Sequence, residues 1–248
     1  MLQNFESLVL IWLGIGFITF ITLLKIPAPY GKFSKTNWGP MIPSKLGWIV
    51  MEIISPLALL YFFLNGNIEK TPTNITFISL WTLHYFNRSV IYPLRQNNPS
   101  QMPLLIAVLA FFFNVMNGYI NGTYFGSIQE YSAEYMSNWN FIVGVCLFVI
   151  GAYINIKSDN ILLSLRSKSG EYKIPEGFMF RYVSFPNYLG EILEWMAFAI
   201  MTWSLAGLSF MIWTMANLVP RAIKGHQWYH SKFESYPKNR KAIFPFII

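Results

Sequence analysis

Ionisable side chains stand inside apolar stretches of this sequence, at positions that a membrane would surround. Glu52 lies six residues into the stretch 46–64, which is about 9 Å deep given the rise of a helix. Tyr85 lies seven residues before the end of the stretch 75–92, at a similar depth. A carboxyl group at such depth must be protonated, paired or hydrated, because a bare charge is costly there. We therefore expect Glu52 to be functional, and Glu191 likewise.

Further polar side chains recur at helical spacing. Tyr85, Arg88 and Tyr92 are spaced i, i+3 and i+7, which predicts that they share one face of a helix. Three other sets share a face in the same way: Asn187, Glu191 and Glu194; Asn155 and Asp159; Asn217 and Arg221. All four sets fall toward the same side of the predicted bilayer. We expect them to form one polar region in one leaflet.

Other polar residues have simpler interpretations. Asn114, Asn117 and Asn121 form a stripe that leads toward the other face, and we interpret it as a source of interhelical hydrogen bonds. Arg88 and Arg221 stand near the ends of apolar stretches, where long cationic side chains commonly extend to the interface. Position alone assigns these two arginines no role.

The elements that must position these groups are transmembrane helices. Hydrophobic residues make up 54% of the 248 residues and charged residues only 12%, against about 25% charged in soluble domains. Seven apolar stretches approach the length of about 20 residues that a spanning helix needs: 5–24, 46–64, 75–92, 102–121, 139–156, 187–206 and 207–223. The last two are divided at Ser204–Gly207, since an unbroken helix would exceed the membrane. The predicted fold is an all-α integral membrane bundle of seven transmembrane helices.

The positive charges predict how this bundle is oriented. If the N-terminus is outside, Lys70 is the only basic residue in the outward connections, and the inward connections and the tail carry all the other basic residues that lie outside the apolar stretches. This asymmetry obeys the positive-inside rule and predicts a cytosolic C-terminus.

The first apolar stretch has no positive residue before it, so we expect a helix there rather than a signal peptide. We expect residues 1–248 to form one domain, whose longest connection, 157–186, is a candidate functional loop.

The sequence lacks the motifs that would indicate several other classes of function. No G-x-G-x-x-G and no G-x-x-x-x-G-K-[ST] is present, so a dinucleotide would have to be held by helices and loops. His226 and His230 are four residues apart, but no carboxylate or cysteine completes a metal site with them. No G-x-S-x-G elbow is present. The net charge is +7, and the basic residues are distributed as the orientation of a membrane protein requires. We therefore expect no nucleic-acid partner.

Four longer segments carry a resemblance: GAYINIKSD (151–159), NYLGEILEW (187–195), AIMTWSL (199–205) and FESYPKNRKAIFPF (233–246), joined by HYFNR (84–88) and Glu52. They resemble the steroid 5α-reductase family, the NADPH-dependent 3-oxo-5α-steroid 4-dehydrogenases. The resemblance implies hydride transfer to the C4=C5 bond of a 3-oxo-4-ene steroid. We expect a monomer without a metal. Glu52 and Tyr85 would face the 3-keto group.

The resemblance also implies which residues bind NADPH. They are Tyr92, Asn155, Asp159, Arg166, Tyr172, Asn187, Glu191, Arg221, His226 and Tyr229, and most of them lie in the more recognisable part of the chain, about 139–248. Arg166, Lys173, Arg181 and Arg221 are the cations expected to meet its phosphates. The chain departs from the family at Met51, where a Gln is common, and at 224–226, where the family's histidine cluster is thinned.

Other functions remain open from the residues. Related membrane reductases act on polyprenols, enoyl thioesters or other lipid enones, and isoprenylcysteine methyltransferases have a similar bundle but bind S-adenosylmethionine. A transporter would need polar residues through both leaflets, and only the asparagine stripe reaches the outer one. We expect a multi-pass protein in contact with membrane lipid, in the inner membrane of a bacterium or the endoplasmic reticulum of a eukaryote.

Overall fold

The computed structural model describes residues 2–96, 100–165 and 172–248. These residues are mostly helical, and four helices are long and apolar enough to cross a membrane: α1 (Leu2–Lys25), α2 (Ser44–Leu64), α5 with its continuation (Leu104–Ile128) and α6 (Trp139–Leu165). The helical class is thereby confirmed. The number of spans and the orientation stay predictions.

The chain divides into two compact units, which are described one at a time. The first consists of Met1–Val9 and Ala28–Ile142, and the second of Leu10–Pro27 and Val143–Ile248. The remaining elements are α3 (Pro72–Phe86), α4 (Tyr92–Leu94), α7 (Pro186–Thr202), α8 (Leu205–Lys232), the 3-10 helices η1 (Gly31–Phe33), η2 (Thr36–Trp38), η5 (Ala133–Ser137) and η6 (Phe178–Arg181), and the π-helical turns η3 (Asn87–Ile91) and η4 (Tyr124–Ile128).

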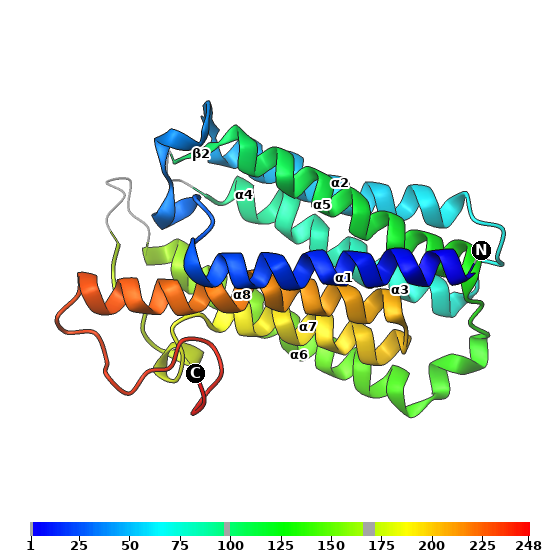
Figure 1. Cartoon of the computed structure of the whole chain (residues 1–248). Helices are drawn as coiled ribbons and strands as arrows, with labels where there is room; N and C mark the ends of the chain where they lie inside the picture. The colour runs from blue at the N-terminus through cyan, green and yellow to red at the C-terminus, as the bar shows by residue number, and fades with distance from the viewer. Residues whose placement is uncertain (1, 97–99, 166–171) are drawn as a thin grey trace. The chain divides into compact units, whose positions relative to one another are not determined.

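In the first unit, α2 and α5 (Leu104–Thr123) lie side by side (Figure 1). Glycines spaced four apart let the two backbones touch. A Cβ on Gly118 would lie 2.6 Å from that of Ala58, and one on Gly122 would lie 2.6 Å from the carbonyl oxygen of Leu59. Small residues at this spacing are the usual device by which membrane helices approach closely.

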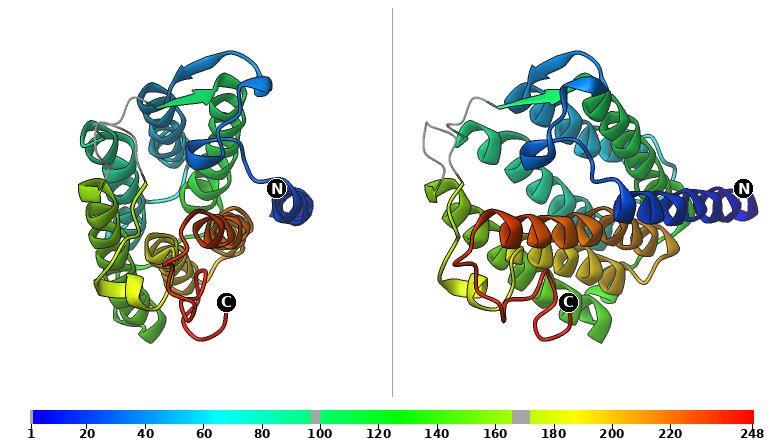
Figure 2. Two further views of the ribbon diagram at one scale, coloured as in Figure 1. Left: turned by 90° about the vertical axis from the view of Figure 1, so that its left-hand side faces the viewer. Right: turned by 60° about the vertical axis from the view of Figure 1, so that its left-hand side comes forward.

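Two short strands, which the sequence did not predict, lead into these helices. β1 (Met41–Pro43) pairs antiparallel with β2 (Gln101–Pro103), as Figure 2 shows beside the starts of α2 and α5. The pairing is extended by the Ser44 amide, which donates to the Ser100 carbonyl at 2.9 Å, and by the Leu104 amide, which donates to Pro40 at 2.8 Å. The strands therefore fix where both helices begin.

The third helix of this unit changes its winding partway. Thr71 caps α3 by accepting a hydrogen bond from the Asn74 amide at 3.3 Å, and Pro72 occupies the first turn. At Asn87 the helix passes into the π-helical turn η3 and then into α4. Such turns are rare and frequently occur at functional sites. This one begins two residues after Tyr85.

In the second unit, α7 and α8 pack side by side and are separated where the sequence predicted a break. Trp203 adopts a left-handed conformation with φ of 47°, and the Ser204 hydroxyl accepts a hydrogen bond from the Gly207 amide at 2.9 Å to cap α8. The turn residue is thus Trp203 and not the expected glycine. α8 also continues beyond the expected end at 223.

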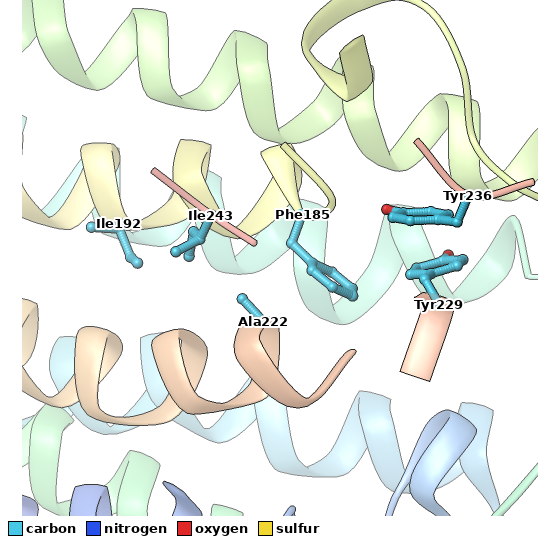
Figure 3. Close-up of a cluster of buried hydrophobic side chains, with 6 residues drawn as sticks. All are labelled: Phe185, Ile192, Ala222, Tyr229, Tyr236 and Ile243. Carbon is cyan, nitrogen blue, oxygen red and sulfur yellow. The ribbon is translucent and has the colours of Figure 1, made fainter. Parts of the chain in front are cut away.

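The chain after α8 folds back without regular structure. Val183 forms a parallel bridge with Lys241, and a buried cluster unites this tail with α7 and α8 (Figure 3). The cluster contains Phe185, Ile192, Ala222, Tyr229, Tyr236 and Ile243. The tail is therefore part of the core of the second unit.

Candidate functional site

In the first unit, Tyr85 is joined to two neighbouring helices through one amide. Its side chain is 5% exposed, and its phenol oxygen lies 3.4 Å from Oδ1 of Asn114 on α5. The Asn114 Nδ2 donates to the carbonyl oxygen of Met51 on α2 at 2.6 Å. That second bond fixes the amide so that its oxygen faces the phenol, which must therefore be the donor. Three helices are thus tied together at Tyr85.

The ring of Tyr85 is held from several sides. Trp81 stacks on it at a centroid distance of 5.7 Å, and His84 meets it edge-on at 5.2 Å. Trp81 is itself fixed by its indole N–H, which donates to the Ser55 hydroxyl at 3.1 Å. In the π-helical turn, the Ser89 hydroxyl donates to the Tyr85 carbonyl at 2.7 Å. A phenol held in this way is preorganised for hydrogen bonding.

Glu52 is half-buried on α2 and directly follows Met51, whose carbonyl accepts the Asn114 bond. The prediction of interhelical hydrogen bonding is confirmed for Asn114. It is wrong for the amide nitrogen of Asn121, which donates to the Asn117 carbonyl in its own helix. Spacing alone gave no sign that Asn114 reaches Tyr85.

Arg88 and Tyr92 form an aromatic and cationic group with Trp48. The Arg88 guanidinium carbon lies 5.3 Å from the Trp48 ring centroid and 5.0 Å from that of Tyr92. Arg88 is only 9% exposed, so it is enclosed by these rings rather than extended to the interface. The face of each ring attracts the guanidinium electrostatically.

In the second unit, three of the predicted cofactor residues meet. The Asn187 Nδ2 donates to Asp159 Oδ1 at 3.0 Å, and the Asn155 Nδ2 donates to the Asn187 carbonyl at 2.9 Å. All three side chains are buried. The Asn187 Oδ1 is a buried acceptor with no hydrogen-bond partner among the described residues. Buried acceptors are nearly always satisfied, so this oxygen calls for a donor from a ligand or water.

This arrangement depends on direct contact between the backbones of α6 and α7. A Cβ on Gly190 would lie 2.5 Å from the Asn155 backbone nitrogen, and one on Gly151 would lie 2.7 Å from that of Glu194. No side chain larger than hydrogen fits at either position without movement. The two glycines therefore bring Asn155 and Asn187 within hydrogen-bonding distance.

The other predicted cofactor residues lie on α7, on α8 and in the segment after residue 171. The Arg221 Nε donates to the Tyr188 hydroxyl at 3.1 Å, and Glu191 lies half-buried on the same helix as Tyr188. The ring of Tyr172 meets Trp228 edge-on at 5.0 Å. Arg166 lies outside the described residues. Tyr92 is in the first unit, with Arg88 and Trp48.

His226 stands beyond the last apolar stretch, on the final turns of α8. Its Nδ1 lies 2.6 Å from the Ser184 hydroxyl oxygen. Burial, and then the nearby His230, Arg240 and Lys241, lower the pKa of His226 to about 4. The imidazole is therefore neutral at physiological pH. Ser184, Tyr188, Tyr236 and Arg240 were not singled out from the sequence, because Ser184 precedes α7, Tyr236 and Arg240 lie in the irregular tail after α8, and a tyrosine near the end of an apolar stretch needs no functional explanation.

Comparisons with known proteins cover nearly the whole chain. The profile of a family described as 3-oxo-5-alpha-steroid 4-dehydrogenase matches residues 100–248. The chain is 43% identical to the steroid 5-alpha-reductase DET2 of Solanum lycopersicum over 98% of this chain and 96% of that protein. It is 36% identical to the 3-oxo-5-alpha-steroid 4-dehydrogenase 1 of Rattus norvegicus, over 94% and 91%, and 34% identical to that of Homo sapiens, over 94% and 92%.

Proposed function

The chain belongs to the 3-oxo-5-alpha-steroid 4-dehydrogenase family, and from that premise we propose that it reduces the C4=C5 bond of a 3-oxo-4-ene steroid with NADPH. The observation that carries this proposal is the phenol of Tyr85, which is buried, stacked and aligned by the Asn114 amide. Glu52 follows the residue whose carbonyl holds that amide.

The reaction needs a group that stabilises negative charge on the steroid's ketone oxygen. NADPH, when bound, supplies the hydride that reaches C5. The electron pair of the C4=C5 bond then moves toward the ketone, and the oxygen gains charge as an enolate. Tyr85 donates a hydrogen bond to that oxygen, and a proton from solvent or a side chain completes the product at C4. A fixed donor in a site that excludes water is among the strongest catalytic devices.

The ligand-free geometry is compatible with this role. The bond from Tyr85 to Asn114 is 3.4 Å long, well beyond the usual 2.7–2.8 Å of an O–H···O bond. A ketone oxygen at an ordinary distance would accept the hydrogen bond of the phenol in place of Asn114, and little hydrogen-bond energy would be lost. Glu52 acts as the partner of Tyr85 or, in its protonated form, as a second donor to the ketone.

The residues of the second unit fit a dinucleotide. Asn187 presents its unsatisfied Oδ1, which suits an amide N–H such as that of the nicotinamide carboxamide. Arg221 offers a guanidinium for phosphate oxygens. We assign NADPH to the full set that the resemblance implies: Tyr92, Asn155, Asp159, Arg166, Tyr172, Asn187, Glu191, Arg221, His226 and Tyr229.

We further propose that the chain acts as a monomeric reductase with seven spans, an outside N-terminus and a cytosolic C-terminus. The four long apolar helices support the membrane assignment, and the distribution of basic residues supports the orientation. α3, η3 and α4 together run from residue 72 to 94, which is long enough for a further span.

The direct test uses the purified protein in detergent with NADPH and testosterone or progesterone. Loss of absorbance at the nicotinamide band, together with a 5α-reduced product identified by mass spectrometry and its retention time, is the expected result. Reduction of an enoyl thioester or a polyprenyl substrate in place of both steroids would overturn the substrate assignment. Transfer of a methyl group from S-adenosylmethionine would overturn the reaction itself.

A further inference from the structure

A chain of hydrogen bonds in the second unit runs from a buried arginine to His226. The Arg240 Nη1 lies 3.3 Å from the Tyr236 hydroxyl, which lies 2.7 Å from the Ser184 hydroxyl, which in turn lies 2.6 Å from His226 Nδ1. Arg240, Tyr236 and Ser184 are 4%, 3% and 1% exposed. Solvent therefore has little access to the groups that face His226 from this side.

The direction of each bond follows from what each group can donate. A guanidinium has donors and no acceptor, so the Tyr236 hydroxyl accepts a hydrogen bond from Arg240 and donates one to the Ser184 hydroxyl. The single Ser184 proton then has two acceptors within reach, His226 Nδ1 at 2.6 Å and the Lys241 carbonyl oxygen at 3.1 Å. The Lys241 carbonyl already accepts from the Ser184 amide at 2.8 Å. The shorter contact and the unsatisfied nitrogen assign the Ser184 proton to His226.

Nearby charge favours the same assignment. Arg240 and Lys241 act on His226 as cations. A nitrogen lone pair directed toward cations is more stable than an N–H directed toward them. Hydrogen bonds in a chain that begins at a cation also polarise one another. The proton of the neutral imidazole is consequently on Nε2.

The surrounding core fixes this chain in place. The ring of Tyr236 stacks on Tyr229 at a centroid distance of 5.1 Å and an angle of 12° (Figure 3). The Arg240 Nη1 also donates to the Pro175 carbonyl at 3.1 Å. Backbone bonds from Ser184 to Lys241 and from Lys241 to Tyr182, at 2.8 and 2.9 Å, anchor the tail beside the residues before α7.

We propose that Arg240, Tyr236 and Ser184 are positioning residues that hold His226 as a neutral imidazole protonated on Nε2, which donates a hydrogen bond to a phosphate oxygen of the bound dinucleotide. The choice of ligand rests on the proposed function, whereas the tautomer does not. A neutral donor binds the phosphate without a change of protonation near neutral pH.

The tautomer is measured first, without cofactor. The chain has three histidines, so long-range ¹H–¹⁵N spectra of ¹⁵N-histidine-labelled protein in micelles resolve each ring, and His226→Gln and His230→Gln assign the signals. His226 is expected to show the pattern of an Nε2–H imidazole from pH 6 to 8. An Nδ1–H pattern, or a doubly protonated ring at pH 7, would overturn the proposal.

Two variants test the positioning. Ser184→Ala removes the direct donor and Tyr236→Phe removes the link to Arg240, and both are expected to add Nδ1–H signal or raise the pH at which His226 titrates. The matched controls are Ser231→Ala and Tyr182→Phe, since Ser231 and Tyr182 are exposed. Unchanged His226 signals in both variants, with an unfolding midpoint like that of the wild type, would refute the positioning of His226 by this chain of hydrogen bonds. Should Ser184→Ala fail to fold, Tyr236→Phe alone decides.

Cofactor binding separates this inference from the proposed function. By isothermal titration, Ser184→Ala and Tyr236→Phe are expected to weaken NADPH binding by about tenfold, the effect of losing one hydrogen bond to a charged group. If the wild type shows the expected tautomer but binds no NADPH, the proposed cofactor is wrong and the proton assignment stands. If Ser184→Ala and Tyr236→Phe bind NADPH as tightly as the controls Ser231→Ala and Tyr182→Phe, the contact between His226 and the cofactor is refuted.

Discussion

The Asn114 side chain aligns the phenol of Tyr85: its amide oxygen faces that phenol at 3.4 Å while its amide nitrogen donates to the Met51 carbonyl at 2.6 Å. The short bond holds the amide, and the long bond leaves the phenol available. Because the shorter of the two hydrogen bonds is made to a backbone atom of α2, the orientation of the Asn114 amide does not depend on any mobile side chain.

Replacement of Tyr85 by Phe removes the proposed donor without changing the stacking surface. We expect turnover to fall by about 10²-fold or more, the effect of losing one oxyanion donor. Steady-state consumption of NADPH with progesterone measures it. Tyr61→Phe is the control, because Tyr61 is 62% exposed on α2. Wild-type turnover in Tyr85→Phe would remove the phenol from the mechanism.

Replacement of Asn114 by Leu keeps the volume and removes the amide. We expect kcat to fall about tenfold, because the phenol loses its alignment and the Met51 carbonyl loses its donor. Asn121→Leu is the matched control from the same helix, since the Asn121 amide nitrogen donates within α5. Equal losses of kcat in the two variants would reduce Asn114 to a packing role.

Replacement of Asn187 by Ala removes the unsatisfied acceptor and the donor to Asp159. We expect NADPH affinity to fall by about tenfold or more, since Asp159 also loses a charge-assisted hydrogen bond. Arg221→Ala is expected to weaken binding as well. Titration calorimetry measures both, with exposed Asn160→Ala on α6 as the control. Wild-type affinity in both variants would undo the cofactor assignment.

Replacement of Gly190 by Ala tests the contact between α6 and α7. The added methyl would lie 2.5 Å from the Asn155 nitrogen, and overpacking of this kind costs about 1–3 kcal/mol. A drop of about 2–4 °C in the unfolding midpoint per kcal/mol is expected for a chain of this size. Gly14→Ala is the control, because a Cβ there meets nothing within 4 Å. Equal midpoints for the two variants would contradict the close approach.

The lowered pKa of His226 gives a pH dependence of known sign. The folded value is about 4 and the ordinary value is 6.5, so the unfolded chain binds the proton first as pH falls. Stability is therefore lost between pH 6.5 and 4, and it is fully present above that window. We expect the unfolding midpoint of the wild type to fall more steeply from pH 7 to 5 than that of His226→Gln. Parallel profiles would mean that His226 is not desolvated.

The long helices were predictable because apolar length alone identifies them. α2 was expected over 46–64 and occupies Ser44–Leu64, and the break near Ser204 was located correctly. Winding within a helix was not predictable. The π-helical turn Asn87–Ile91 adds about one residue to a turn, and the helical spacing of Tyr85, Arg88 and Tyr92 gave no sign of it.

The polar interior was predictable only in part. Asn155, Asp159 and Asn187 follow helical spacing, and the structure joins them. Asn114 has the same spacing as an ordinary interhelical link, so its neighbour on α3 could not be inferred. Arg240 belongs to an irregular tail, where no period relates one residue to the next. Burial of its charge depends on partners that come together only in the folded chain.

The contact of backbone on backbone at Gly151 and Gly190 leaves no intervening layer of side chains between α6 and α7. The separation of the amides of Asn155 and Asn187 is consequently determined by main-chain geometry. Positions on the faces of either helix that point away from this contact are then free to vary, while the amide pair keeps its dimensions. The outer surface of these helices can therefore evolve independently of the geometry of the two amides.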